Sequence, residues 1–258
     1  MKHLIFAGNW KMNHAPADGA AFLREFLAHY QRHQDRSVIL FPPALTLAAL
    51  VAGLKDRSDI QLGVQNIHWE DKGAFTGENS APIARAAGAR YALVGHSERR
   101  HVFGETNDQA RQKVGAALRA GLIPVLCVGE TLAERERGET ERVVLEQLHA
   151  GVAGLDAAHI GQMIVAYEPV WAIGTGKNAT PTDANAVHAV LNAALRESTN
   201  RAGGVPVLYG GSVNQSNVQA LISQPHINGV LVGGASLDAG GWQSIVTAKT
   251  MESAPTGG

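Results

Sequence analysis

The chain of 258 residues carries 22 Lys and Arg against 23 Asp and Glu, and it contains a single cysteine. The balanced charge excludes a broad basic surface for nucleic acid or an acidic membrane, and one cysteine excludes an internal disulfide framework. The length fits either two small domains or one α/β barrel, and the composition predicts a cytoplasmic protein.

The first apolar run covers residues 3–10 in the N-terminal segment MKHLIFAGNWKMN. It is too short for a signal peptide, and no apolar span of 18 residues occurs in the sequence, so we expect no association with a membrane. Further runs rich in Val, Ile and Leu follow at 37–43, 60–66, 90–96, 123–129, 163–169, 205–211 and 229–235. Most are almost continuously apolar, which is typical of parallel strands covered on both faces.

Segments with helical spacing lie between these runs. One begins at Asn107, which can cap its N-terminus, and ends at Gly121. Another has Pro181 in its first turn and carries an apolar face made of Val187, Val190, Leu191 and Leu195.

Eight strands alternating with helices predict right-handed crossovers and a single α/β domain, a (β/α)8 barrel with eight parallel strands, over residues 1–250. The polar tail at 251–258, rich in Gly and Pro, is predicted to be disordered. A doubly wound sheet is the structural alternative. However, no GxGxxG follows the first strand, and no change in composition divides the series.

Polar residues and glycines end most of the predicted strands. Because the carboxyl ends of barrel strands meet at one rim, we expect these residues to be neighbours despite their separation in sequence. In chain order they are Asn9 and Lys11, Gln65 and Asn66, His96, Glu168, Gly210 to Ser212, and Gly233 with Gly234.

The stretch AYEPVWAIGTGK, residues 166–177, places an acid between an apolar strand and an apolar loop. Pro169 fixes one backbone angle directly after Glu168, while Gly174 and Gly176 free the far end of the loop. This arrangement suits a lid that closes over a ligand, because the Val, Trp and Ile between them are costly to leave in water. The alternative is a surface loop with one exposed acid.

His96 precedes Ser97 and Glu98, which can begin a helical turn. A helix N-terminus disfavours positive charge, so we expect a neutral imidazole that donates a hydrogen bond, although a purely structural histidine is the alternative. Lys11 on its own could be a solvated lysine. Asn9 on the same rim favours an electrostatic role near an anion.

The glycine pairs 210–211 and 233–234 predict an anion site, because bare backbone N–H groups bind phosphate without a side chain. Each pair alone could be a plain turn, but their positions after the seventh and eighth strands suit a barrel phosphate site. Cys127, between Leu126 and Val128, is expected to be a buried packing residue. No pattern of His, Cys or acidic residues predicts a metal site.

The chain resembles the triosephosphate isomerase family over nearly its whole length, in the segments FAGNWKMN, GAFTGENS, VGHSERR, PVLCVGE, AYEPVWAIGTGK, YGGSV and LVGGASL. The resemblance implies a TIM barrel without cofactor or metal. It also implies interconversion of dihydroxyacetone phosphate and D-glyceraldehyde 3-phosphate through an enediolate, as in glycolysis and gluconeogenesis.

The resemblance also implies residue roles. Glu168 is the base that moves the carbon-bound proton, His96 polarises the carbonyl, and Lys11 and Asn9 stabilise negative charge. Glu98 matches a family acid to which we assign no role. The implied substrate-binding residues are Asn9, Lys11, Gly174, Ser212, Gly233 and Gly234.

The loop from Gly73 to Ser80 resembles the projecting loop by which family members enter a partner subunit, so we expect a homodimer, with an ordinary solvent loop as the alternative. Two residues depart from the family pattern. Asn178 lies in the trailing hinge of the lid, where it could alter the rate of closure. Asn228 replaces an expected acid, which could alter stability or the turn.

Two other classes of function compete with the isomerase. A Schiff-base aldolase on the same scaffold needs a lysine in an apolar pocket, but the sixth strand ends in Glu168. Borohydride trapping with substrate would identify it. A non-catalytic phosphate-binding module would lack the acid or the imidazole, and both are present.

Overall fold

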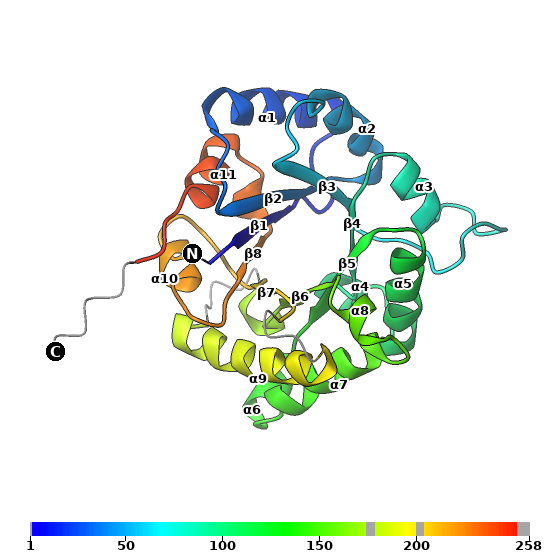
Figure 1. The fold of residues 1–258 in the computed structure, drawn as a ribbon, viewed down its shortest axis with the longest axis vertical. Coiled ribbons are helices and arrows are strands. Elements are labelled where there is room, and N and C mark those ends of the chain that lie inside the picture. The colour runs from blue at the N-terminus through cyan, green and yellow to red at the C-terminus, as the bar shows by residue number, and fades with distance from the viewer. Residues whose placement is uncertain (1, 174–178, 200–203, 252–258) are drawn as a thin grey trace.

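The computed structural model describes residues 2–173, 179–199 and 204–251 (Figure 1). Its centre is a closed barrel of eight parallel strands in chain order, with β1 paired to both β2 and β8. The prediction of a (β/α)8 barrel is thereby confirmed. The strands are β1 Leu4–Asn9, β2 Arg36–Phe41, β3 Ile60–Val64, β4 Tyr91–Val94, β5 Ile123–Val128, β6 Ile164–Tyr167, β7 Val207–Tyr209 and β8 Gly229–Val232.

Helices form the outer layer around this barrel (Figure 1). They are α1 Pro16–His29, α2 Ala44–Gly53, α3 Ala81–Ala86, α4 Ser97–His101, α5 Asn107–Arg119, α6 Leu132–Glu136, α7 Thr140–Val152, α8 Ala157–Ile160, α9 Pro181–Thr199, α10 Val218–Ile222 and α11 Ala239–Val246. Two short 3-10 turns, η1 Val170–Ala172 and η2 Gly234–Ser236, follow β6 and β8.

The strands bury both of their faces. Alternate residues such as Ile5 and Ala7 fill the barrel interior, whereas Leu4 and Phe6 pack in the layer between strands and helices. This explains why the strands are almost continuously apolar in sequence. Cys127 lies in the interior cluster and is fully buried, as expected. Burial raises the pKa of its thiol well above the ordinary value, so it acts as a packing residue.

Two helix details differ from the prediction. The N-cap of α5 is Thr106 and not Asn107, because Thr106 and Gln109 form a reciprocal capping box. The buried stripe of α9 includes Ala184 and His188 together with Leu191 and Leu195, while the predicted Val187 and Val190 are only partly buried.

Asn228 connects three strands at the amino end of the barrel. Its side-chain oxygen accepts a hydrogen bond from Val207 N at 3.0 Å, and its backbone oxygen accepts one from Ile5 N at 3.0 Å. An amide oxygen here accepts as a carboxylate would. Of the predicted tail, only Met251 lies within the described residues.

Candidate active site

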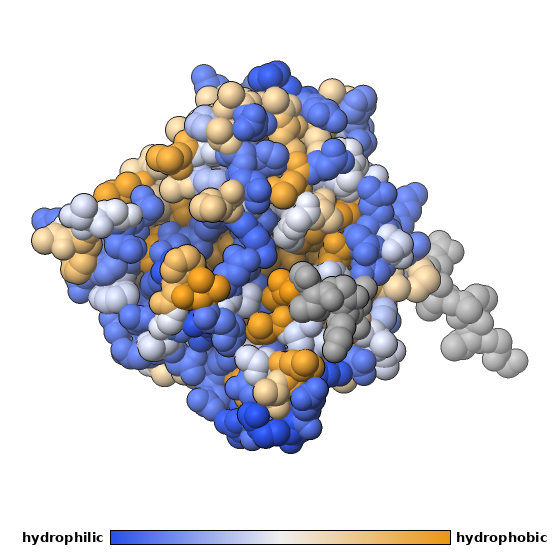
Figure 2. Space-filling view, turned by 180° about the vertical axis from the view of Figure 1, so that it is seen from behind, coloured by the Kyte–Doolittle hydropathy of each residue, from blue (hydrophilic) through white to orange (hydrophobic). Residues whose placement is uncertain are grey.

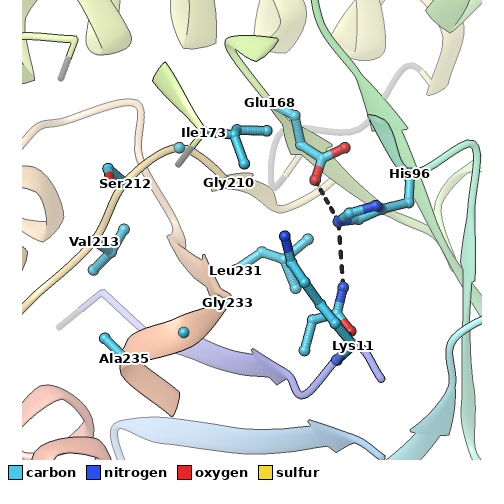
Figure 3. A pocket seen from close by; sticks show the side chains of 13 residues that line it. Lys11, His96, Glu168, Ile173, Gly210, Ser212, Val213, Leu231, Gly233 and Ala235 are labelled. Carbon is cyan, nitrogen blue, oxygen red and sulfur yellow. Dashed lines mark hydrogen bonds and ion pairs between the residues drawn. The ribbon is translucent and has the colours of Figure 1, made fainter. Parts of the chain in front are cut away.

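The carboxyl ends of the strands surround a cavity of about 280 Å³, here called the rim pocket (Figure 3). It brings together seven of the predicted site residues: Asn9, Lys11, His96, Glu168, Ser212, Gly233 and Gly234. Gly174 lies outside the described residues. The other lining residues are Ile173, Gly210, Gly211, Val213, Leu231 and Ala235.

Glu168 and His96 face each other on one side of the rim pocket (Figure 3). Glu168 directly follows β6 and is 2% exposed, and its Oε1 lies 3.0 Å from His96 Nε2. Its other oxygen, Oε2, accepts a hydrogen bond from Ser97 N at 2.8 Å. The acid is therefore buried and held in one orientation, and the alternative of an exposed acid on a surface loop is wrong.

His96 is the N-cap of α4. Its Nδ1 accepts a hydrogen bond from Glu98 N at 3.2 Å, which requires an unprotonated Nδ1. The remaining ring hydrogen is then on Nε2 and points to Glu168. The local backbone thus selects the neutral tautomer that donates from Nε2 into the pocket.

The two side chains shift each other's pKa. Burial raises the pKa of the Glu168 carboxyl, but the neighbouring His96 and the Ser97 N–H outweigh burial and hold it below its ordinary value. Burial lowers the pKa of His96, but the Glu168 carboxylate outweighs burial and raises it. The upward shift of the His96 pKa depends mainly on Glu168 beside the ring, and Glu98, 3.8 Å from Nδ1, adds to it, whereas burial and the helix N-terminus both favour a neutral imidazole.

Asn9 and Lys11 approach from the end of β1. The Oδ1 of Asn9 accepts from Lys11 N at 3.0 Å, so its Nδ2 faces His96 Nε2 at 3.2 Å. Because both nitrogens are donors when Nε2 carries a hydrogen, the amide hydrogens of Asn9 are available to a ligand oxygen.

The backbone of Lys11 is in the left-handed region, with φ of 51°, which costs about 1–3 kcal/mol and is typical of functional sites. Gln65 holds this turn by donating to Lys11 O at 2.7 Å. The Lys11 ammonium points towards the pocket (Figure 3) and pairs with Glu98 Oε1 at 2.5 Å. Glu98, to which the sequence analysis assigned no role, therefore lies beside the Lys11 ammonium.

The opposite wall of the pocket, here called the backbone wall, combines Gly210 and Gly233 with the side chains of Ser212, Val213 and Ala235 (Figure 3). Gly233 caps η2, whose first N–H groups have no partner within the turn. A Cβ at Gly234 would meet no atom of the described residues within 4 Å, so a ligand can approach this backbone closely. Ser212 adds a hydroxyl to the same wall. The cation of Lys11 and these donors favour an anionic ligand.

The start of the predicted lid is well anchored. Trp171 in η1 donates from Nε1 to Glu130 Oε1 at 2.8 Å, and the Arg135 guanidinium lies 4.4 Å from the Trp171 ring. Ile173 follows and lines the rim pocket. The remainder of the predicted lid, including Gly174 and Asn178, lies outside the described residues.

Some residues that shape the rim pocket could not be identified from the sequence. Ser97 acts through its backbone N–H, which no residue type reveals, and Leu231 inside β8 looks like any core residue. The sequence places Gly210 in the predicted anion site, but it gives no sign that Gly210 also makes room for the base: a Cβ there would lie 2.8 Å from Cγ of Glu168. A glycine at a strand end is a usable signal only when the neighbouring side chain is known.

Comparisons with known proteins show what this chain is similar to in sequence and fold. The family model described as triosephosphate isomerase matches residues 4–249. The triosephosphate isomerase of Paracidovorax citrulli is 49% identical over 96% of this chain and 98% of that protein. That of Acaryochloris marina is 47% identical over 95% of this chain and 99% of its own. The crystal structure of triosephosphate isomerase from Bartonella henselae superposes with a TM-score of 0.84 at 37% identity, covering 95% of this chain and 98% of that one.

Proposed function

The chain belongs to the triosephosphate isomerase family, and we propose that Glu168 and His96 carry out its reaction in the rim pocket. The enzyme is an aldose–ketose isomerase that interconverts dihydroxyacetone phosphate and D-glyceraldehyde 3-phosphate, the isomerisation step of glycolysis and gluconeogenesis. The assignment of residues rests on one observation above all: a buried carboxylate lies 3.0 Å from Nε2 of an imidazole whose Nδ1 accepts from the backbone, in a pocket that Ser212, Gly233 and Gly234 also line.

Glu168 takes the role of the base. When a substrate enters, the carboxylate leaves His96 Nε2, removes the proton from the carbon next to the carbonyl and returns it to the neighbouring carbon. The carboxylate is ionised before the substrate arrives, because its neighbours hold the pKa of Glu168 below the ordinary value. Burial makes the base stronger once the hydrogen bonds to His96 and Ser97 are given up.

His96 takes the role of the electrophile. Its Nε2–H, released by Glu168, donates to the substrate oxygen on which negative charge develops. Asn9 Nδ2 and the Lys11 ammonium add further donors to the same region of the pocket. Three donors then converge where the enediolate forms.

The phosphate is held by the backbone wall. Ser212, Gly233 and Gly234 supply N–H groups and a hydroxyl, and Lys11 supplies a charge. We propose that Gly174 joins them when the lid closes. A closed lid matters because an enediol phosphate in water readily loses its phosphate, and the apolar Val170 and Ile173 help to exclude solvent.

We propose a homodimer in which the loop from Gly73 to Ser80 enters the partner subunit. On the face of the molecule seen in Figure 2, apolar residues (orange) are exposed among polar ones (blue). Exposed large apolar residues, which water disfavours, gather in the segments that follow β1 to β4: Met12, Leu45, Phe75, Ile83, Val102 and Phe103.

We further propose that residues 1–250 form one catalytic domain and that the enzyme acts in the cytoplasm. The continuous barrel and the single, buried Cys127 support these two assignments. No helix within the described parts of the chain is long and apolar enough to cross a bilayer.

Hydrogen exchange tests the role of the base. Turnover in deuterium oxide should place solvent deuterium on the neighbouring carbon of the product, to which Glu168 returns the proton, because the carboxyl exchanges its proton with solvent before returning it. Glu168→Gln should abolish both turnover and this exchange while still binding inorganic phosphate. Exchange at the wild-type rate in the Gln variant would show that another group is the base.

A further inference from the structure

Arg100 lies in α4, four residues after His96, and its guanidinium binds three acceptors. Nε donates to Gly95 O at 2.7 Å, Nη2 to Cys127 O at 3.2 Å and Nη1 to Asn107 Oδ1 at 2.7 Å. Gly95 follows β4, Cys127 belongs to β5, and Asn107 begins α5. One side chain therefore ties together three elements behind His96, using the fixed fork geometry that only arginine offers.

Gly95 is held from both sides. Its φ of 69° lies in the left-handed region that favours glycine. A Cβ built there would lie 2.7 Å from Nη2 of Arg100, so the guanidinium packs directly against this residue. Gly95 N donates to Glu105 Oε1 at 2.8 Å, while Gly95 O accepts from Arg100. The Gly95 carbonyl belongs to the peptide unit that carries His96 N, so its orientation sets the direction of the His96 side chain.

We propose that Arg100 is a positioning residue for the isomerisation: by fixing the Gly95–His96 peptide unit, it directs His96 Nε2 into the rim pocket. Arg100 is not among the residues that line the pocket, so it acts through His96 and not on the substrate. The proposal rests on the role proposed above for His96.

Arg100→Met removes all three hydrogen bonds, and Arg100→Lys keeps a charge but loses the fork. A misplacement of the ring of about 1 Å should lower kcat by about 100-fold in both variants. KM should stay within about twofold, because the backbone wall and Lys11 that hold the phosphate are untouched. If the methionine variant does not fold, the lysine variant can still be assayed and tests the same prediction.

A double-mutant cycle separates positioning from a structural role. Arg100→Met should lower kcat in the wild-type background and have little further effect in His96→Gln, because the residue through which it acts is already gone. An equal fall in kcat in both backgrounds would overturn the proposal. A lysine variant with normal kcat beside an impaired methionine variant would also overturn it, since charge alone would then suffice.

Leu148→Ala is the control for lost stability, because Leu148 lies on the buried face of α7 and outside the pocket lining. It should lower the melting temperature and leave kcat per folded enzyme unchanged; a matching loss of kcat in this variant would overturn the proposal. The single variant His96→Gln distinguishes a failure of the role proposed for His96 from a failure of the role proposed for Arg100. Normal kcat in His96→Gln would refute the role of His96 and the proposal with it. Impaired His96→Gln beside normal Arg100 variants would refute the proposal only.

Discussion

Individual residues shape the rim pocket by what they lack as much as by what they carry. The missing side chain at Gly210 leaves room for Glu168, whose Cγ would lie 2.8 Å from a Cβ at that position. The carbonyl of Tyr167, 3.2 Å from the same point, blocks a simple shift of the new methyl group. The base therefore depends on a neighbour that carries no reactive group.

Gly210→Ala should push the Glu168 carboxylate away from its present position. We expect kcat to fall by about 10- to 100-fold, because proton abstraction is sensitive to displacements of this size. Steady-state kinetics with either triose phosphate measures the change. Gly115→Ala is the control, since among the described residues a Cβ there would approach the end of the Arg119 side chain alone, at 3.5 Å. Wild-type kcat in Gly210→Ala would show that the carboxylate adapts freely.

Most of the residues around the pocket could be named from the sequence, since they end strands that a barrel brings together. Their pairing could not. The contact of Glu98 with Lys11 and the bond from Ser97 N to Glu168 depend on backbone positions that are set by the closed barrel. Residue type indicates which chemistry is possible, whereas three-dimensional distance decides which groups perform it together.

At the level of elements, α9 contains a buried polar residue that the mechanism does not use. His188 is fully buried against Tyr167 and Tyr209, with ring centroids 5.8 and 6.4 Å away, and neither ring nitrogen has a hydrogen-bond partner among the described residues. Burial lowers the pKa of His188 to about 3. The folded protein thus keeps this ring neutral.

This burial predicts a loss of stability in acid. An unfolded histidine titrates near pH 6.5. The contribution of the buried His188 to the free energy of unfolding is therefore complete above that pH and is lost as the pH falls towards 3. The loss approaches about 1.4 kcal/mol per pH unit for one group. In His188→Leu, the free energy of unfolding should fall less steeply between pH 6.5 and 5, as measured by urea titrations.

The matched control is His149→Gln, because His149 is exposed on the surface of α7. This variant should keep the wild-type slope of unfolding free energy against pH. An unchanged slope of unfolding free energy against pH in His188→Leu would contradict this prediction. It would mean that His188 takes up a proton in the folded protein or that other groups cause the loss of stability in acid.

The helices show where local signals suffice and where they do not. Pro181 correctly placed the start of α9, because proline suits a first helical turn. The exact buried stripe could not be predicted, because a histidine is not counted as apolar even where two tyrosines enclose it. For α5, the pair Thr106 and Gln109 was a readable capping signal that a nearby Asn obscured.

For the whole molecule, the barrel was predictable because each strand is buried on both faces and eight strands suffice to close the sheet. The oligomeric state could not be predicted from the residues alone, because a solvent-exposed loop and a loop that contacts a partner subunit can have the same composition. The exposed apolar residues after β1 to β4 support the proposed dimer only once the barrel has placed these segments at one end.

Phe103→Glu should shift the protein from dimer to monomer, because the proposed interface would lose an apolar side chain and would have to bury a carboxylate. Phe103 is 66% exposed in the single chain, so the folded subunit should tolerate the change. Light scattering measures the mass. Leu132→Glu, which is also exposed but lies on α6, should keep the wild-type mass. A monomeric wild-type enzyme would contradict the proposal.

The central claim is that the carboxylate of Glu168 is placed to act as the base opposite His96. The turnover of Glu168→Asp tests it most directly, because the shorter side chain keeps the charge but withdraws it from the substrate carbon. We predict a folded enzyme with KM near the wild-type value and kcat lowered by about 100-fold or more. A kcat close to wild type in this variant would contradict the account.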